Sequence, residues 1–310
     1  MTQPSGLALT GAQYDITAGD YRATITELGA GLRRLSYRGR PAIVEYEADE
    51  MPPAGAGQLL APWPNRVDGG RYTFQGVARQ LDLSEPAAGN AIHGLTRWHN
   101  WQPAAREASL VELRHVLYGQ PGYPFCLELT ARYQLSADDG LQVTVSAANA
   151  GSAAAPYGTG CHPYLTAGLP LVDDCQLELP ASRWLTADDR GIPVGGPADV
   201  AGTEFDFRAL RAIGGTRIDH AFTGLTADGD GRVRARLAGP ETELEFWAGP
   251  GYAWLQVFTG DALAPERRRR ALAIEPMTCP PNALVSGTDL ITLAPGERVT
   301  HHWGIRLQSL

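Results

Sequence analysis

Alternation of apolar and polar residues with a period of two recurs along the chain and constrains its fold more than any other feature. Successive side chains of a strand point to opposite faces of a sheet, so each alternating stretch predicts a strand with one buried face. Turn signals separate these stretches, for example Gln75-Gly76 and the glycine-rich residues 228–231. The predicted strands are residues 21–28, 110–117, 125–135, 141–147, 233–237, 242–247, 253–258 and 297–307.

Helices are disfavoured throughout, because 36 Gly and 23 Pro are spread over nearly every window in which a helix would form. We expect one or two short helices at most. No repeat of fixed period and no Ser/Gly linker divides the chain. The sequence therefore predicts an all-β fold of antiparallel sheets, a sandwich or barrel, built as a single domain over residues 1–310.

The charge and composition exclude several classes of function. The formal net charge is −8, a field that repels nucleic-acid phosphates, so no nucleic-acid partner is expected. All 26 basic residues are Arg, which excludes Schiff-base chemistry on a lysine. No apolar run reaches the length of a membrane helix and the start lacks a signal-peptide pattern, so we expect a cytoplasmic protein without a membrane partner.

The cysteines and the common ligand motifs give no indication of a metal or cofactor. Four cysteines are widely spaced with no CxxC pair, and we expect reduced, structural thiols at Cys126, Cys161, Cys175 and Cys279. No GxGxxG, Walker, HExxH or GxSxG motif occurs. Gly55-Ala56-Gly57 begins like a dinucleotide-binding loop but lacks the third glycine, so we predict a flexible surface turn there. His301 and His302 are adjacent in a predicted strand, where their side chains face opposite ways and cannot bind one metal ion.

Several polar residues stand beside stiff Pro, Gly or aromatic neighbours. These segments are residues 62–66, 92–94, 160–164, 218–220 and 274–276. Catalytic groups are held on stiff loops at strand ends in many enzymes. Taken singly, however, a histidine beside a proline is more often a core residue, and a lone glutamate after a β-run usually faces solvent.

Taken together and in order, these segments resemble the aldose 1-epimerase (galactose mutarotase) family. The resemblance spans about residues 21–307 and is carried by residues 60–66, 90–95, 162–165, 219–222, Glu275-Pro276 and 281–283. It implies a β-supersandwich, no metal or organic cofactor, and interconversion of the α and β anomers of a free hexose. The implied partner is a small sugar, and the protein is expected to be a monomer or homodimer.

The resemblance also implies roles for individual residues. Ring opening requires a base for the anomeric hydroxyl and an acid for the ring oxygen, and these positions match Glu275 and His162. Arg66, His93 and Asp219 match positions that hold sugar hydroxyls. Asn65 is expected to contact the substrate as well. Four aromatic residues lie close in sequence to these groups and either wall the pocket or pack in the core: Trp63, Trp98, Tyr164 and Phe222. Of these, Trp98 and Tyr164 are the expected substrate contacts.

Alternatives stay open on the sequence alone. Arg97 is either a surface or structural residue or a cationic subsite for an anionic sugar, such as glucose 6-phosphate or a sulfonated hexose; a neutral aldose is the first expectation. The Arg267 to Arg270 run is expected to be a solvated loop rather than an anion site. A non-catalytic carbohydrate-binding protein remains possible, as does a glycosidase that uses Asp219 and Glu275 as paired carboxylates.

Overall fold

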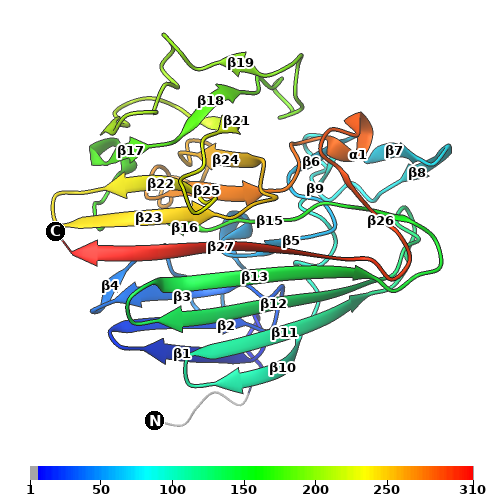
Figure 1. Cartoon of the computed structure of the whole chain (residues 1–310), viewed down its shortest axis with the longest axis horizontal. Helices are drawn as coiled ribbons and strands as arrows, with labels where there is room; N and C mark the ends of the chain where they lie inside the picture. Colours follow the sequence, from blue (N-terminus) through cyan, green and yellow to red (C-terminus); the bar gives the residue numbers. More distant parts are fainter. Residues whose placement is uncertain (1–5, 310) are drawn as a thin grey trace.

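The computed structural model describes residues 6–309 and consists almost entirely of antiparallel strands (Figure 1). The largest sheet has nine strands, and its long members run side by side across the molecule. In spatial order they are β10 (Gln102–Glu107), β11 (Leu110–Leu117), β12 (Leu127–Ser136), β13 (Gly140–Asn149), β27 (Arg298–Ser309), β23 (Thr242–Ala248), β22 (Val233–Ala238), β17 (Gln176–Glu178) and β20 (Arg211–Ala212).

A second sheet of eight strands carries most of the site described below. Its order is β19 (Ala198–Asp199), β18 (Ala181–Trp184), β21 (Asp219–Leu225), β24 (Trp254–Phe258), β25 (Leu272–Met277), β15 (Gly160–Cys161) and β5 (Leu59–Leu60), and β16 (Tyr164–Leu165) also pairs with β25. All six residues of β25 are buried, so both faces of this strand are covered.

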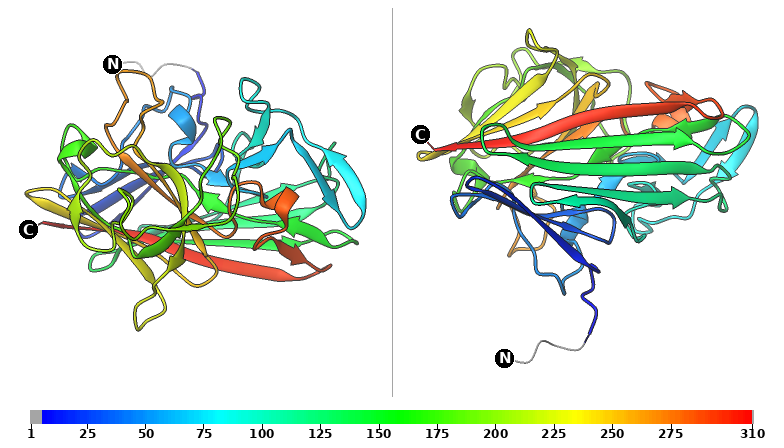
Figure 2. Two further views of the ribbon diagram at one scale, coloured as in Figure 1. Left: turned by 90° about the horizontal axis from the view of Figure 1, so that it is seen from above. Right: turned by 60° about the horizontal axis from the view of Figure 1, so that its bottom comes forward.

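The remaining strands form smaller sheets. Four strands at the start of the chain, drawn in blue in Figure 2, form one sheet: β1 (Gln13–Ala18), β2 (Tyr21–Thr26), β3 (Leu32–Tyr37) and β4 (Arg40–Pro41). Three two-stranded pairs are β6 (Arg66–Asp68) with β9 (Asn90–Ile92), β7 (Arg71–Phe74) with β8 (Val77–Gln80), and β14 (Ala155–Tyr157) with β26 (Ile291–Leu293).

Helical structure in residues 6–309 is limited to α1 (Ala283–Ser286) and the 3₁₀ turns η1 (Pro53–Gly55) and η2 (Val172–Asp174), as the glycine and proline content predicts. None of these helices is long and apolar enough to cross a membrane. The four cysteines are free thiols.

The predicted alternation is confirmed in the long strands. In β12 every second residue from Leu127 to Leu135 is buried, and each alternating stretch of the sequence coincides with a strand. The turn between β12 and β13 falls at residues 137–139, in the gap between the predicted strands 125–135 and 141–147. The buried faces of the sheets meet in one large apolar core, and the fold class predicted from the sequence is confirmed.

Candidate active site

A cleft of about 370 Å³ opens above the central strands of the eight-stranded sheet. It gathers all eight residues that the sequence predicts for the site: Asn65, Arg66, His93, Trp98, His162, Tyr164, Asp219 and Glu275. Trp63 and Phe222, by contrast, are buried in the core and do not line the cleft. Residues more than 200 positions apart in the sequence therefore share one site.

Strand register explains why His162 and Glu275 meet. Gly160 in β15 pairs with Met277 in β25, and Tyr164 in β16 pairs with Ala273, so both pairings have the same register. The short break between β15 and β16 thus places His162 opposite Glu275. Its Nε2 lies 3.3 Å from Oε1 of Glu275.

Both members of this pair are almost completely buried, with Glu275 2% and His162 5% exposed. Burial raises the pKa of Glu275 well above its usual value, with a further rise from the Asp219 charge and an opposing effect of Arg66. Burial also lowers the pKa of His162 to about 3. Each group is thus shifted toward its neutral form, the carboxylic acid for Glu275 and the uncharged imidazole for His162.

A second histidine, His93, lies edge-on to the ring of His162, with the ring centroids 5.4 Å apart. Its Nδ1 accepts a hydrogen bond from the backbone N–H of Asn65 at 3.2 Å. Burial lowers the pKa of His93 well below its usual value. A neutral imidazole that accepts through Nδ1 carries its proton on Nε2, so His93 is a hydrogen-bond donor at Nε2.

A buried glutamine that was not predicted from the sequence binds one of the charged residues of the cleft. Gln256 lies opposite Glu275 in the β24–β25 register, and its Nε2 donates to Oδ1 of Asp219 at 2.7 Å. Its Oε1 is buried without a partner in residues 6–309. The sequence contains one signal for it: Gln256 is the single polar residue in the apolar run 253–258.

Aromatic side chains and Arg97 shape the rest of the cleft. The Tyr164 ring stacks on His162, with centroids 4.8 Å apart and an interplanar angle of 23°, and so fixes the imidazole plane. Trp98 is 43% exposed and lines the cleft together with Arg97. The Arg97 guanidinium lies 5.2 Å from the centroid of the Trp98 ring. Arg97 is therefore a residue of the cleft, not a remote surface arginine.

The expectation about the glycine-rich turn next to His162 is wrong. Gly55-Ala56-Gly57 is a buried turn rather than a flexible surface turn, because the N–H of Gly57 donates to the carbonyl of His162 at 2.8 Å and its backbone packs against Leu32. This turn therefore helps to hold the backbone of His162 in place.

The arginine run is not simply a solvated loop. Arg269 is largely buried, and it binds the carboxylates of Asp173 and Asp261 and the carbonyls of Gly214 and Thr216. Arg267 pairs with Glu50. Two of the four arginines therefore fasten neighbouring loops together.

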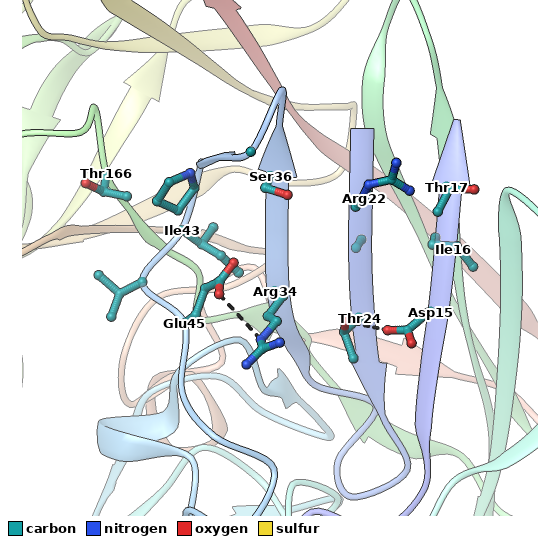
Figure 3. A pocket seen from close by; sticks show the side chains of 14 residues that line it. Asp15, Ile16, Thr17, Arg22, Thr24, Arg34, Ser36, Ile43, Glu45 and Thr166 are labelled. Carbon is teal, nitrogen blue, oxygen red and sulfur yellow. Dashed lines mark hydrogen bonds and ion pairs between the residues drawn. The ribbon is translucent and has the colours of Figure 1, made fainter. Parts of the chain in front are cut away.

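A larger hollow, of about 810 Å³, lies on the outer face of the β1–β4 sheet and shares no lining residue with the cleft. Its polar side chains bind one another: Thr24 donates to Asp15 at 2.6 Å, and Arg34 pairs with Glu45 at 3.4 Å (Figure 3). In residues 6–309 no group of three or more His, Cys, Asp or Glu side chains is placed to hold a metal ion.

Comparison with known proteins places this arrangement in a family. A family model described as aldose 1-epimerase matches residues 12–306. An uncharacterised protein of Escherichia coli, YihR, is 38% identical over 295 residues, which cover 95% of this chain and 93% of that protein. The chain belongs to the aldose 1-epimerase family. This is a family of isomerases that act on carbohydrates, and the predicted resemblance is confirmed.

Other members of the aldose 1-epimerase family show the same relationship at lower identity. The aldose 1-epimerase of E. coli is 29% identical over 67% of this chain and 64% of its own length. Among solved structures, a GalM/aldose epimerase homologue from Caenorhabditis elegans superimposes with a TM-score of 0.86 at 17% identity, covering 96% of this chain and 99% of that one. The galactose 1-epimerase of Lactobacillus acidophilus gives 0.81 at 22% identity, with coverages of 94% and 92%. The galactose mutarotase-like fold is thus shared.

Proposed function

We propose that this protein is a mutarotase, an aldose 1-epimerase that interconverts the α and β anomers of a free hexose by acid–base ring opening and closure. The observation that carries the proposal is the direct contact of a carboxyl and an imidazole, Glu275 and His162, at the base of a polar cleft large enough for a sugar ring. Membership of the aldose 1-epimerase family supports it.

The reaction requires two proton transfers at neighbouring oxygens. Glu275 takes the proton of the anomeric hydroxyl, while His162 gives one to the ring oxygen, which becomes the C5 hydroxyl. The resulting aldehyde rotates about its C1–C2 bond, and the reverse transfers close the ring as the other anomer. Well-placed general acid and base groups each contribute roughly 10²–10⁴ in rate.

The proton inventory of the pair suits this cycle. Burial favours the neutral forms of both groups, so a single proton shared by the pair rests on Glu275 rather than on His162. Transfer across the 3.3 Å contact gives the carboxylate and imidazolium that ring opening needs, without any exchange of protons with solvent. The proton count of the site is the same before and after turnover, as an isomerase requires.

The surrounding groups are suited to orienting the sugar. Nε2 of His93 is a donor that faces the same cleft, and we assign it to a ring or hydroxyl oxygen. Arg66 supplies further donors, and the Asp219 carboxylate and the free Oε1 of Gln256 supply acceptors. Trp98 and Tyr164 offer apolar surface to the faces of a pyranose.

Polarimetry of freshly dissolved α-glucose and α-galactose tests the proposal. The protein is expected to accelerate the decay of optical rotation with at least one of the two sugars, and NMR exchange spectroscopy should show the anomers interconverting. Sugar binding without accelerated exchange would instead support a carbohydrate-binding protein, and release of reducing sugar from a disaccharide would support a glycosidase.

Arg97 favours a second candidate, an epimerase for an anionic sugar such as a hexose phosphate or sulfonate. Its guanidinium lines the cleft, is not engaged by any carboxylate in residues 6–309, and has Glu85 nearby already bound to Arg66. An unpaired, half-buried guanidinium suits a phosphate or sulfonate. If the substrate is anionic, Arg97→Gln will reduce kcat/KM for glucose 6-phosphate far more than for glucose; equal changes for both sugars would favour the neutral substrate.

A further inference from the structure

Arg66 is held along one edge of its guanidinium. Its Nε donates to Oε2 of Glu85 and its Nη2 to Oε1 of the same carboxylate, both at 2.9 Å. Such a two-point contact fixes the plane of the guanidinium as well as its position. Nη1 is left as the nitrogen without a hydrogen bond to residues 6–309, on the edge that the carboxylate does not cover.

Glu85 is in turn held by a fully buried asparagine. Nδ2 of Asn90 donates to Oε2 of Glu85 at 3.2 Å, and the two residues are also joined by backbone hydrogen bonds at 2.9 and 3.2 Å. The carboxylate is therefore fixed from both sides, by Arg66 and by Asn90. It has little freedom to follow Arg66 if the guanidinium moves.

A distant loop completes the support. Residues 186–194, here called the Arg190 loop, are closed by a bridge between Ala187 and Pro193. The Arg190 guanidinium donates to Oδ1 of Asn90 at 2.9 Å and to the carbonyl of Ala88 at 2.8 Å, and it pairs with Asp68 at 2.7 Å. The carbonyl of Arg190 accepts from Nδ2 of Asn90 at 2.9 Å.

The Arg190 loop also contacts Arg66 directly. Gly191 has a φ of +72°, and a Cβ added there would lie 2.5 Å from Nη1 of Arg66. The loop thus lies close to the guanidinium, and a side chain at this position would displace Arg66. Arg66 is confined by Glu85 on one edge and by the backbone of Gly191 next to Nη1.

We propose that Glu85 is a positioning residue, which holds Arg66 in its working orientation over the reacting sugar, and that Arg190 keeps Glu85 in place through Asn90. The proposal rests on the proposed function, because the working orientation is defined by the sugar that Glu275 and His162 convert. Without Glu85, the guanidinium has two other carboxylates within its electrostatic reach, those of Asp219 and Glu275. It would turn toward them and occupy space that the substrate needs.

The pH profile separates this role from a purely structural one. The Arg66 charge already opposes the rise in the pKa of Glu275. A guanidinium released from Glu85 comes closer to Glu275 and lowers that pKa further. The limb of the kcat/KM profile that reports Glu275 should therefore move to lower pH in Glu85→Gln, whereas a general loosening of the fold would leave it in place.

The experiment compares Glu85→Gln, Glu85→Asp and Arg190→Met with wild type in the anomer-exchange assay. We expect Glu85→Gln to lose roughly 10–10² in kcat/KM, as misplacement of a substrate-orienting group does, with its Glu275 limb shifted. Glu85→Asp keeps the charge and should recover part of the loss, and Arg190→Met should show a smaller effect of the same kind. Asp20→Asn is the matched control, because it removes a carboxylate from the exposed Arg38–Asp20 pair in another sheet.

A crystal structure of Glu85→Gln keeps the test independent of activity. Arg66 rotated toward Asp219 or Glu275 supports the proposal, and Arg66 in its present position together with an unshifted pH profile overturns it. If Glu85→Gln does not fold, the structure and profile of Arg190→Met decide in the same way, because that variant removes the support of Glu85 through Asn90. If the wild type fails to accelerate anomer exchange, the proposed function falls, and the position of Arg66 in the crystal still decides the role of Glu85.

Discussion

Asn65 and His93 are joined by two hydrogen bonds: the backbone N–H of Asn65 donates to Nδ1 of the His93 ring at 3.2 Å, and the N–H of His93 donates to the carbonyl of Asn65 at 2.9 Å. Both residues have a positive φ, of 54° and 61°, an uncommon conformation for residues other than glycine that concentrates at functional sites. The pair therefore fixes the tautomer of His93 through the main chain rather than through another side chain.

The first prediction concerns that tautomer. Because Nδ1 accepts a hydrogen bond and burial lowers the pKa of the ring, His93 should remain neutral, with its proton on Nε2, at pH 6. ¹⁵N NMR of histidine-labelled protein measures both properties, and His93→Gln assigns the signal. A doubly protonated His93 at pH 6, or a proton on Nδ1, would contradict the geometry.

The second prediction concerns the acid and the base. Glu275→Gln and His162→Asn should each reduce kcat by roughly 10²–10⁴ while circular dichroism shows an intact fold. The kcat of the double variant should be little lower than that of the less active single variant, because the two groups share one proton and act as a unit. Polarimetry measures all three, and full activity in either single variant would refute the assignment.

The third prediction is the pH dependence of turnover. With the pKa of His162 lowered to about 3 and that of Glu275 raised, the pair should keep its single proton from about pH 3 up to the raised pKa of Glu275. The plot of kcat/KM against pH should therefore show no limb due to His162 near 6.5, where an ordinary histidine titrates. A limb near 6.5 that disappears in His162→Asn would show that burial does not control this histidine.

The long strands could be predicted from the sequence because a strand with one buried and one solvent-facing side alternates apolar and polar residues. β12 and β27 have such a side and were predicted within a few residues. β25 has none, and its all-apolar flanks around Glu275 give no period-two signal. The two-residue strands β5, β15 and β16 are too short for any pattern, although they place His162.

The candidate site could likewise be predicted only in part. His93, His162 and Glu275 stand in segments that resemble a known family, so their meeting in one cleft was expected. Glu85 and Arg190 lie in loops, 105 positions apart, and their connection through Asn90 depends on tertiary packing that leaves no local pattern. The Gly55-Ala56-Gly57 turn was misjudged for a related reason, since glycine marks both a flexible surface turn and a close buried contact.

The fourth prediction concerns His301, whose two ring nitrogens are buried without a partner in residues 6–309. Burial lowers its pKa to about 4, below the unfolded value of 6.5. The buried neutral ring therefore destabilises the folded state only below pH 6.5, where the unfolded chain binds a proton that the folded chain does not. The resulting loss in the free energy of unfolding reaches about 3 kcal/mol as the pH falls to 4. Urea unfolding should show His301→Leu losing less stability than wild type between pH 7.5 and 4.5; parallel losses would contradict this.

The fifth prediction uses two glycines with the same backbone conformation. Gly191 has a φ of +72° and Gly195 one of +76°, so Ala at either position costs about 1 kcal/mol of backbone strain. Only at Gly191 does the new Cβ meet Arg66, whereas at Gly195 it meets open space. Both variants should show similar falls in the unfolding midpoint, but Gly191→Ala alone should also lose anomer-exchange activity, with a rise in KM as Arg66 is displaced. Equal activities in the two variants would show that the loop tolerates movement there, and that Arg66 is confined less closely than its contacts indicate.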